Sequence, residues 1–189
     1  MTFLHRYAAF IDGLTSRVGR AASWATLAMV LIGAFNAIAR YYDRDLGTQL
    51  SSNRWIELQW YLFSIVFLLG AAWTLREQRH VRVDVLYTRF PPRVQAWIDL
   101  AGSVLFLVPL CLFALWFAYE PVTNSIRILE GSRDPGGLPR WPIKAVVPIA
   151  FLLLLLQATS EVAKNLLRLR GKLPRSLEPS VSSGPETTA

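Results

Sequence analysis

The residues best suited to catalysis or metal binding are few in this chain, and their spacing builds no recognisable site. The two histidines, His5 and His80, lie outside the long apolar stretches, so they cannot ligate a haem within a membrane bundle. His80 and Asp84 are four residues apart, and two ligands do not make a metal site. The single cysteine, Cys111, is expected to be a small packing residue. Nucleophile-elbow and phosphate-loop motifs are missing, so we expect no enzyme and no cofactor.

Other polar groups lie on or beside the apolar stretches. Asn36, Gln59 and Gln157 carry amides that can form hydrogen bonds between helices within a membrane. The nearby ionisable residues stand at the ends of the stretches, and these are Glu57, Asp99, Lys144 and Glu161. A transporter that moves ions or acids by itself usually has ionisable groups near the bilayer midplane. The pattern therefore favours a partner subunit over a self-sufficient pump.

Four uncharged stretches must position these groups, in a chain of 189 residues that is 53% hydrophobic and only 17% charged. They cover residues 21–39, 58–75, 100–119 and 145–160. A hydrocarbon core of about 30 Å needs roughly 17–25 apolar residues per helix. We therefore predict an all-α integral membrane four-helix bundle, with spans at about 21–39, 55–75, 98–119 and 142–163. No other segment is long enough for a separate soluble domain.

The basic residues predict the orientation of this bundle. Thirteen of the 20 lie in the N-terminal segment, the middle loop and the C-terminal segment, and seven lie in the first and third loops. Short cytoplasmic loops are enriched in Lys and Arg, so both termini and the middle loop are expected in the cytoplasm. The net charge of +7 is then explained by topology and by anionic lipid headgroups. Nucleic acid is not an expected partner.

The two ends of the chain differ from the central domain, residues 21–168. Residues 1–20 have the pattern of an amphipathic interfacial helix, with apolar residues at three- and four-residue steps. In this pattern His5, Arg6, Asp12, Ser16 and Arg17 face away from the apolar side. A cleaved signal peptide is the alternative, but its core would be shorter than the 19-residue span. Residues 169–189 are rich in Pro and Ser and are predicted to form a disordered cytoplasmic tail.

Several short sequence motifs, which occur in order along the four spans, resemble those of a known family. They are Trp55–Phe63 (WIELQWYLF), Phe67–Ala72 (FLLGAA), Arg76–Val85 (REQRHVRVDV) and Pro135–Lys144 (PGGLPRWPIK), followed by Pro148 and Gln157. This arrangement is similar to the small, DctQ-like permease subunit of tripartite ATP-independent periplasmic (TRAP) transporters. The motif Pro135–Lys144, with Pro148 and Gln157 after it, resembles a subgroup of this family that is labelled for mannitol or chloroaromatic compounds.

The resemblance implies a role and a location. In such transporters a periplasmic solute-binding protein captures an organic acid, and a large membrane subunit carries it inward, driven by an ion gradient. The small subunit lies in the bacterial inner membrane, braces the large subunit and helps to dock the binding protein. Its partners would be these two proteins and membrane lipids.

The resemblance also places candidate contact residues on the chain. Glu57 would pair with Arg54 or with the large subunit, near the outer end of the second span. The candidate partner-interface residues are Glu57, Gln59, Trp60, Arg79, His80, Arg82, Asp84, Trp141, Asn36 and Gln157. A different class of function, a self-assembling small channel or exporter, stays open. It would need a polar stripe along one span, for which the sequence offers few residues.

Overall fold

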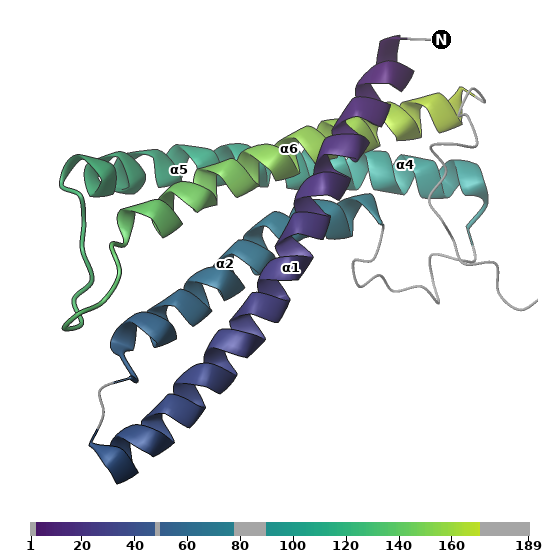
Figure 1. Ribbon diagram of the computed structural model, residues 1–189. Helices are drawn as coiled ribbons and strands as arrows, with labels where there is room; N and C mark the ends of the chain where they lie inside the picture. The colour runs from purple at the N-terminus through teal and green to yellow at the C-terminus, as the bar shows by residue number, and fades with distance from the viewer. Residues whose placement is uncertain (1–2, 48–49, 78–89, 171–189) are drawn as a thin grey trace, which may run out of the picture.

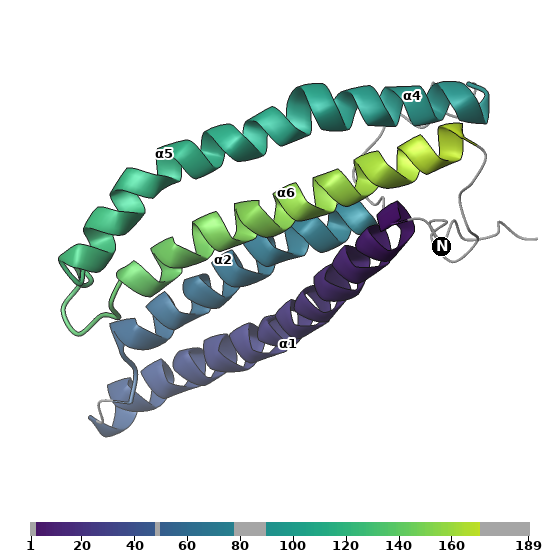
Figure 2. The same ribbon diagram turned by 90° about the horizontal axis from the view of Figure 1, so that it is seen from above.

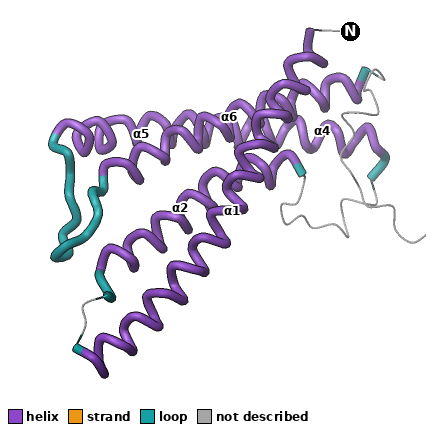
Figure 3. The backbone as a smooth tube through the Cα atoms, viewed as in Figure 1, coloured by secondary structure: helices purple, strands orange, loops and turns teal. Residues whose placement is uncertain are grey.

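The computed structural model describes residues 3–47, 50–77 and 90–170, and every secondary-structure element in this part of the chain is a helix. The elements are α1 (Phe3–Leu46), α2 (Asn53–Arg76), α4 (Pro92–Gly102), the π-helix η1 (Ser103–Leu107), α5 (Val108–Arg127) and α6 (Trp141–Leu169) (Figure 1). Residues 128–140 form the loop between α5 and α6, as the backbone trace shows (Figure 3). The predicted all-α class is confirmed.

Four of the described helical segments are long and apolar enough to cross a membrane. They are Leu4–Asp45, Asn53–Arg76, Arg93–Arg127 and Trp141–Leu169. The third combines α4, η1 and α5 in one continuous rod. Each predicted span lies within one of these segments, so the prediction of a multi-span membrane protein is confirmed.

Helix α1 is longer than a span requires. Its 44 residues correspond to about 66 Å at 1.5 Å per residue, roughly twice the hydrocarbon thickness. The segment predicted as an amphipathic interfacial helix is helical from Phe3, and it continues into the apolar part without interruption. The change in composition near residue 20 is therefore not accompanied by a break in the helix.

The helices form an open layer in the order α1, α2, α6 and α5 (Figure 2). Helix α6 contacts α1, α2, α4 and α5, whereas α1 packs mainly against α2. In the most apolar window of α6, 33% of the residues are buried, against 11% or less in the other three spans. Helix α6 is thus the central element, and the other helices leave wide apolar faces exposed.

The rod that contains α4 and α5 is bent (Figure 2). Within η1 the hydrogen bonds widen, so that the backbone N–H of Val108 donates to the carbonyl of Ser103. Pro109 follows directly, and it has neither an N–H group nor room for the carbonyl four residues before it. A π-turn and a proline are both known causes of helix bending.

Close approach of α1 and α2 depends on Gly19. A Cβ atom at this position would lie 2.5–2.7 Å from three side-chain atoms of Trp73, whereas one at Gly13 would meet no atom within 4 Å. We expect Gly19→Ala to lower the free energy of unfolding by about 1–3 kcal/mol, because the indole must move. Gly13→Ala is the matched control, and it should be neutral or stabilising by up to about 1 kcal/mol. Thermal unfolding in detergent measures both, and equal effects would contradict the close approach.

Candidate functional site

The first turns of α2 hold the loop that joins α5 to α6. Glu57 is buried, and its carboxylate accepts hydrogen bonds from the hydroxyl of Ser132 and from the backbone N–H of Leu138. Ser52 caps α2 by accepting from the backbone N–H of Arg54 at 3.3 Å. Helix α2 is therefore fixed at its start, and it presents Glu57 to the loop. We call these contacts between α2 and residues 130–140 the loop clamp.

Other side chains of α2 reinforce the loop clamp. Arg54 Nε donates to the carbonyl oxygen of Gly136 at 2.7 Å, and the hydroxyl of Tyr61 donates to that of Pro139 at 3.0 Å. Arg54 thus binds the loop backbone and not Glu57, so the predicted pairing of these two residues within the chain is not formed. Gly136 turns the loop with a φ of 71°, a conformation that glycine adopts without strain.

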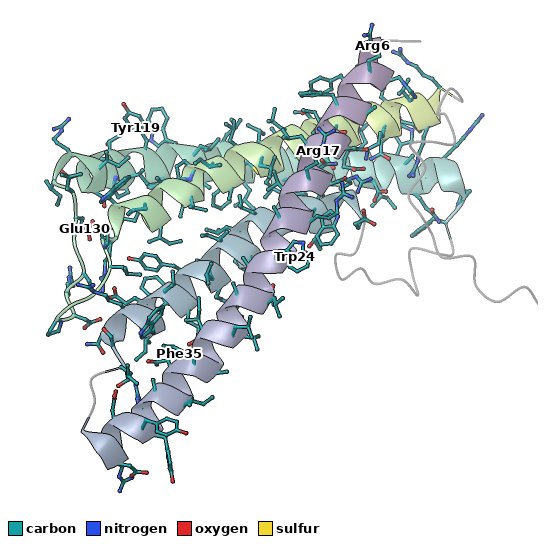
Figure 4. The ribbon with its side chains drawn as sticks, viewed as in Figure 1. Arg6, Arg17, Trp24, Phe35, Tyr119 and Glu130 are labelled. Carbon is teal, nitrogen blue, oxygen red and sulfur yellow. The ribbon has the colours of Figure 1, made fainter. Side chains whose placement is uncertain are left out.

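The base of this loop is closed at Glu130. Helix α5 ends in a Schellman motif, in which the N–H of Glu130 donates to Ser125 and that of Leu129 donates to Ile126. Leu129 takes the left-handed conformation, with a φ of 47°. The carbonyl of Glu130 accepts from the N–H of Arg140 at 2.8 Å, and its carboxylate forms an ion pair with Lys144 on α6. Both ends of the loop are therefore tied together at Glu130, which is labelled in Figure 4.

The tie between Glu130 and Lys144 predicts a dependence on pH. The hydrogen bond from Lys144 lowers the pKa of the Glu130 carboxyl below its ordinary value. A carboxyl group with a lowered pKa stabilises the folded state above its unfolded pKa, and this contribution is lost as the pH falls through the lowered value. Unfolding midpoints measured from pH 6 to pH 3 should fall less in Glu130→Gln than in the parent. Glu120→Gln, on the exposed side of α5, is the control, and it should keep the parental slope.

A second set of polar side chains joins α1 to α6 far from the loop. Lys164 Nζ lies 3.2 Å from Asp12 Oδ2 and 2.5 Å from Glu161 Oε1. Asp12 Oδ1 also accepts from Gln157 Nε2 at 2.9 Å and from Ser160 Oγ at 3.1 Å. These side chains are buried, so they form an ionic network with little exposure to solvent. We call it the polar cluster.

Two further contacts extend the polar cluster along α1. Thr15 Oγ1 donates to Gln157 Oε1 at 2.8 Å, and the hydroxyls of Tyr7 and Thr159 are 2.9 Å apart. Both carboxylate oxygens of Asp12, both polar atoms of the Gln157 amide and the ammonium group of Lys164 have partners, which is the condition for burying such groups at low cost. The first part of α1 is thereby fixed against the second half of α6.

The chemistry of these two sites is structural. Among the described residues, no group of three His, Cys, Asp or Glu side chains could hold a metal ion. The polar cluster is filled by its own donors and acceptors, and the loop clamp is formed by hydrogen bonds to a backbone. Both arrangements fix one element against another.

The family model for the DctQ component of tripartite ATP-independent periplasmic transporters matches residues 29–168. The chain belongs to the DctQ family. It is the small membrane subunit of a TRAP transporter and a component of the inner membrane. No curated protein and no solved structure matched the chain.

The match covers most of this DctQ subunit but not all of its sites. It includes the loop clamp and the α6 half of the polar cluster, whereas Asp12 and Thr15 precede it. It is a match to the DctQ component in general, so the mannitol or chloroaromatic subgroup stays a prediction. The family is one of transport subunits, which agrees with the expectation of no enzyme.

The other predicted site residues of the DctQ subunit are scattered. The Gln59 amide lies against α1, since a Cβ on Gly33 would be 2.5 Å from its Nε2. Trp60 is exposed and stacks edge-to-face on Tyr61. Asn36 is buried, with no hydrogen bond to its Oδ1 from any described group. Trp141 is the first residue of α6. The remaining predicted site residues lie outside the described residues, and they are Arg79, His80, Arg82 and Asp84.

The sequence placed Asp12 on the outward face of the amphipathic helix, and this was wrong. Asp12 turns into the polar cluster because Lys164, 152 positions away in the chain, supplies the opposite charge. Lys164 itself was counted among the basic residues that set orientation. One signal was available: Gln157, Glu161 and Lys164 recur at steps of four and three, which places them on one face of a helix.

Proposed function

We propose that this DctQ subunit braces the large transport subunit and helps to dock the periplasmic solute-binding protein. Two observations support the bracing role. The start of α6 is tied through Lys144 to the loop that the clamp holds, and its second half is fixed to α1 by the polar cluster. The open layer also leaves apolar helix faces uncovered, which suits a subunit that packs against a larger membrane protein.

The loop clamp carries the proposal of docking. Residues 130–140 are held by Glu57, Arg54 and Tyr61, while the side chains of Arg133 and Asp134 stay exposed. A loop that is rigid in its backbone and charged at its tip can bind a partner without a large loss of conformational entropy. By the family's usual role, the transporter would take up an organic acid in symport with an ion.

The orientation of the subunit has a direct test. The native Cys111 is buried, so a cysteine introduced elsewhere can be followed with little background. Cysteines at Asp45 and Arg133 are expected to react with a membrane-impermeant maleimide in intact cells. A cysteine at Phe90 should react only after the cells are lysed. The reversed pattern would contradict both the orientation and the docking proposal.

Partner capture tests the function itself. The tagged subunit is purified in mild detergent from its host, and the proteins bound to it are identified by mass spectrometry. Stoichiometric recovery of one large multi-span protein is expected, whereas recovery of self-oligomers alone would favour the channel alternative. For docking, a photocrosslinker attached at Arg133→Cys should capture a periplasmic protein. The control is Arg170→Cys, at the opposite end of α6, which should capture none.

A further inference from the structure

Three arginines form one line along the first part of α1. Arg6, Arg17 and Arg20 are separated by eleven and three residues, which places them within about 60° of one another on a helix of 3.6 residues per turn. All three are exposed, and no ion pair joins them to another described residue. Arg6 and Arg17 can be followed along α1 in Figure 4. We call this line the basic stripe.

The polar cluster determines where the basic stripe faces. Asp12 is the one acidic residue of α1 before Asp43, and it is turned into the contact with Lys164. Ala8 and Thr15 are buried on the same side of the helix. The stripe therefore lies on the side of α1 that points away from α6, and no carboxylate of this segment neutralises it.

The same side of α1 changes character along its length. Phe10, between the arginines, is 68% exposed, and Trp24, one turn beyond Arg20, is 72% exposed. Leu27 and Leu31 follow on this side and are also exposed. Arginine, then tryptophan, then leucine is the order of side chains that crosses from lipid headgroups into hydrocarbon.

The position of the basic stripe beside α6 agrees with this order of arginine, tryptophan and leucine. Tyr7 reaches Thr159 and Thr15 reaches Gln157, so this segment of α1 lies beside the turns of α6 around residues 157–164. The uncharged run of α6 ends within these turns, at Ser160, and Glu161 begins its charged end. The segment thus lies at the depth where α6 leaves the hydrocarbon core.

We propose that the basic stripe binds the phosphate groups of anionic phospholipids at the inner surface of the membrane. Arginine forms paired hydrogen bonds with phosphate oxygens, and basic residues close to an anionic membrane are attracted to it. Phe10 and Trp24 anchor the same face in the lipid. The polar cluster gives this contact its direction, because it fixes the rotation of α1. The proposal concerns the lipid surface, and it does not depend on the docking of a binding protein.

Lipid titration of the full chain in detergent tests the proposal. Thermal unfolding is followed as phosphatidylglycerol or phosphatidylcholine is added to the micelles. The parent should bind phosphatidylglycerol about ten- to a hundredfold more tightly at low salt, and added salt should weaken this preference. The triple variant Arg6→Gln, Arg17→Gln, Arg20→Gln should lose it. A triple change of the same arginines to lysine should restore most of it, since the charges remain.

A matched variant separates a site from general charge. Arg40, Arg44 and Arg133 are also exposed, and changing them to glutamine removes the same number of positive charges outside the basic stripe. This variant should keep the lipid preference, and an equal loss in both glutamine variants would overturn the proposal. Stabilisation by inorganic phosphate to the same extent would also overturn it, in favour of a free anion site. If the triple glutamine variant of Arg6, Arg17 and Arg20 lost a co-purifying protein but kept the lipid preference, the stripe would be assigned to a protein interface instead.

Discussion

Lys164→Met is expected to lower the free energy of unfolding of this DctQ subunit by about 3–5 kcal/mol. Lys164 is the cation that both buried carboxylates of the polar cluster contact, Asp12 from α1 and Glu161 from α6 itself. Without it, two negative charges would face each other in a site that excludes water. A methionine fills the volume of lysine but offers no hydrogen bond. Reversible unfolding in mixed detergent micelles, followed by tryptophan fluorescence, measures the change.

Two variants separate the loss of the buried charge from the loss of a long side chain. Arg168→Met removes a basic residue one turn further along α6, where it is half-buried, and it should change stability by about 0.5 kcal/mol or less. The triple change of Asp12→Asn, Glu161→Gln and Lys164→Met leaves amides that can hydrogen-bond to one another. It should recover most of the stability, since a buried ionic group adds little over neutral residues that pack equally well.

A small effect of Lys164→Met would mean that the carboxylates are hydrated and that the network is weak. An equal effect of the triple variant would mean that packing, and not charge, holds α1 against α6. In either case the rotation of α1 would no longer be fixed by the polar cluster. The orientation of the basic stripe would then need another cause.

The spans were predictable from the sequence because hydrocarbon imposes a length and a composition on every helix that crosses it. The continuity of helix α1 was harder to predict from the sequence. The pattern of residues 1–20 changes to an apolar run at Ala21, but no proline stands anywhere from Phe3 to Leu46. Backbone continuity follows the hydrogen bonds of the helix, and composition reports only the solvent around it.

The contacts of the two sites were not predictable for a different reason. Amphipathic patterns assume that a charged side chain prefers water, which holds for Arg17 but not for Asp12. The exception needs a lysine 152 residues away to be brought within hydrogen-bonding distance. Glu57 had Arg54 nearby in the sequence, yet it binds Leu138, 81 residues away. Pairings over such separations follow from packing of the helices, and one sequence does not specify them.

Glu57→Ala should free the loop between α5 and α6 from α2. Glu57 is 3% exposed, and the hydroxyl of Ser132 and the backbone N–H of Leu138 both donate to it. Hydrogen bonds to a charged group contribute about 1.5–3 kcal/mol each, so the loop should lose about 2–4 kcal/mol of stability against local opening. Amide hydrogen exchange at Leu138 measures this directly, and the rate should rise about a hundredfold. Glu120→Ala, on exposed α5, should leave it unchanged.

A pair of glycines in the same loop tests the clamp without removing its carboxylate. A Cβ on Gly137 would lie 2.6 Å from Glu57 Oε2 and closer still to Ser132, whereas one on Gly131 would meet no atom within 4 Å. Gly137→Ala should therefore speed exchange at Leu138 as Glu57→Ala does, and Gly131→Ala should not. If the proposed docking depends on a rigid loop, crosslinking from position 133 should fall in Gly137→Ala and persist in Gly131→Ala. Faster exchange with undiminished crosslinking would separate the clamp, which would stand, from the docking role, which would not.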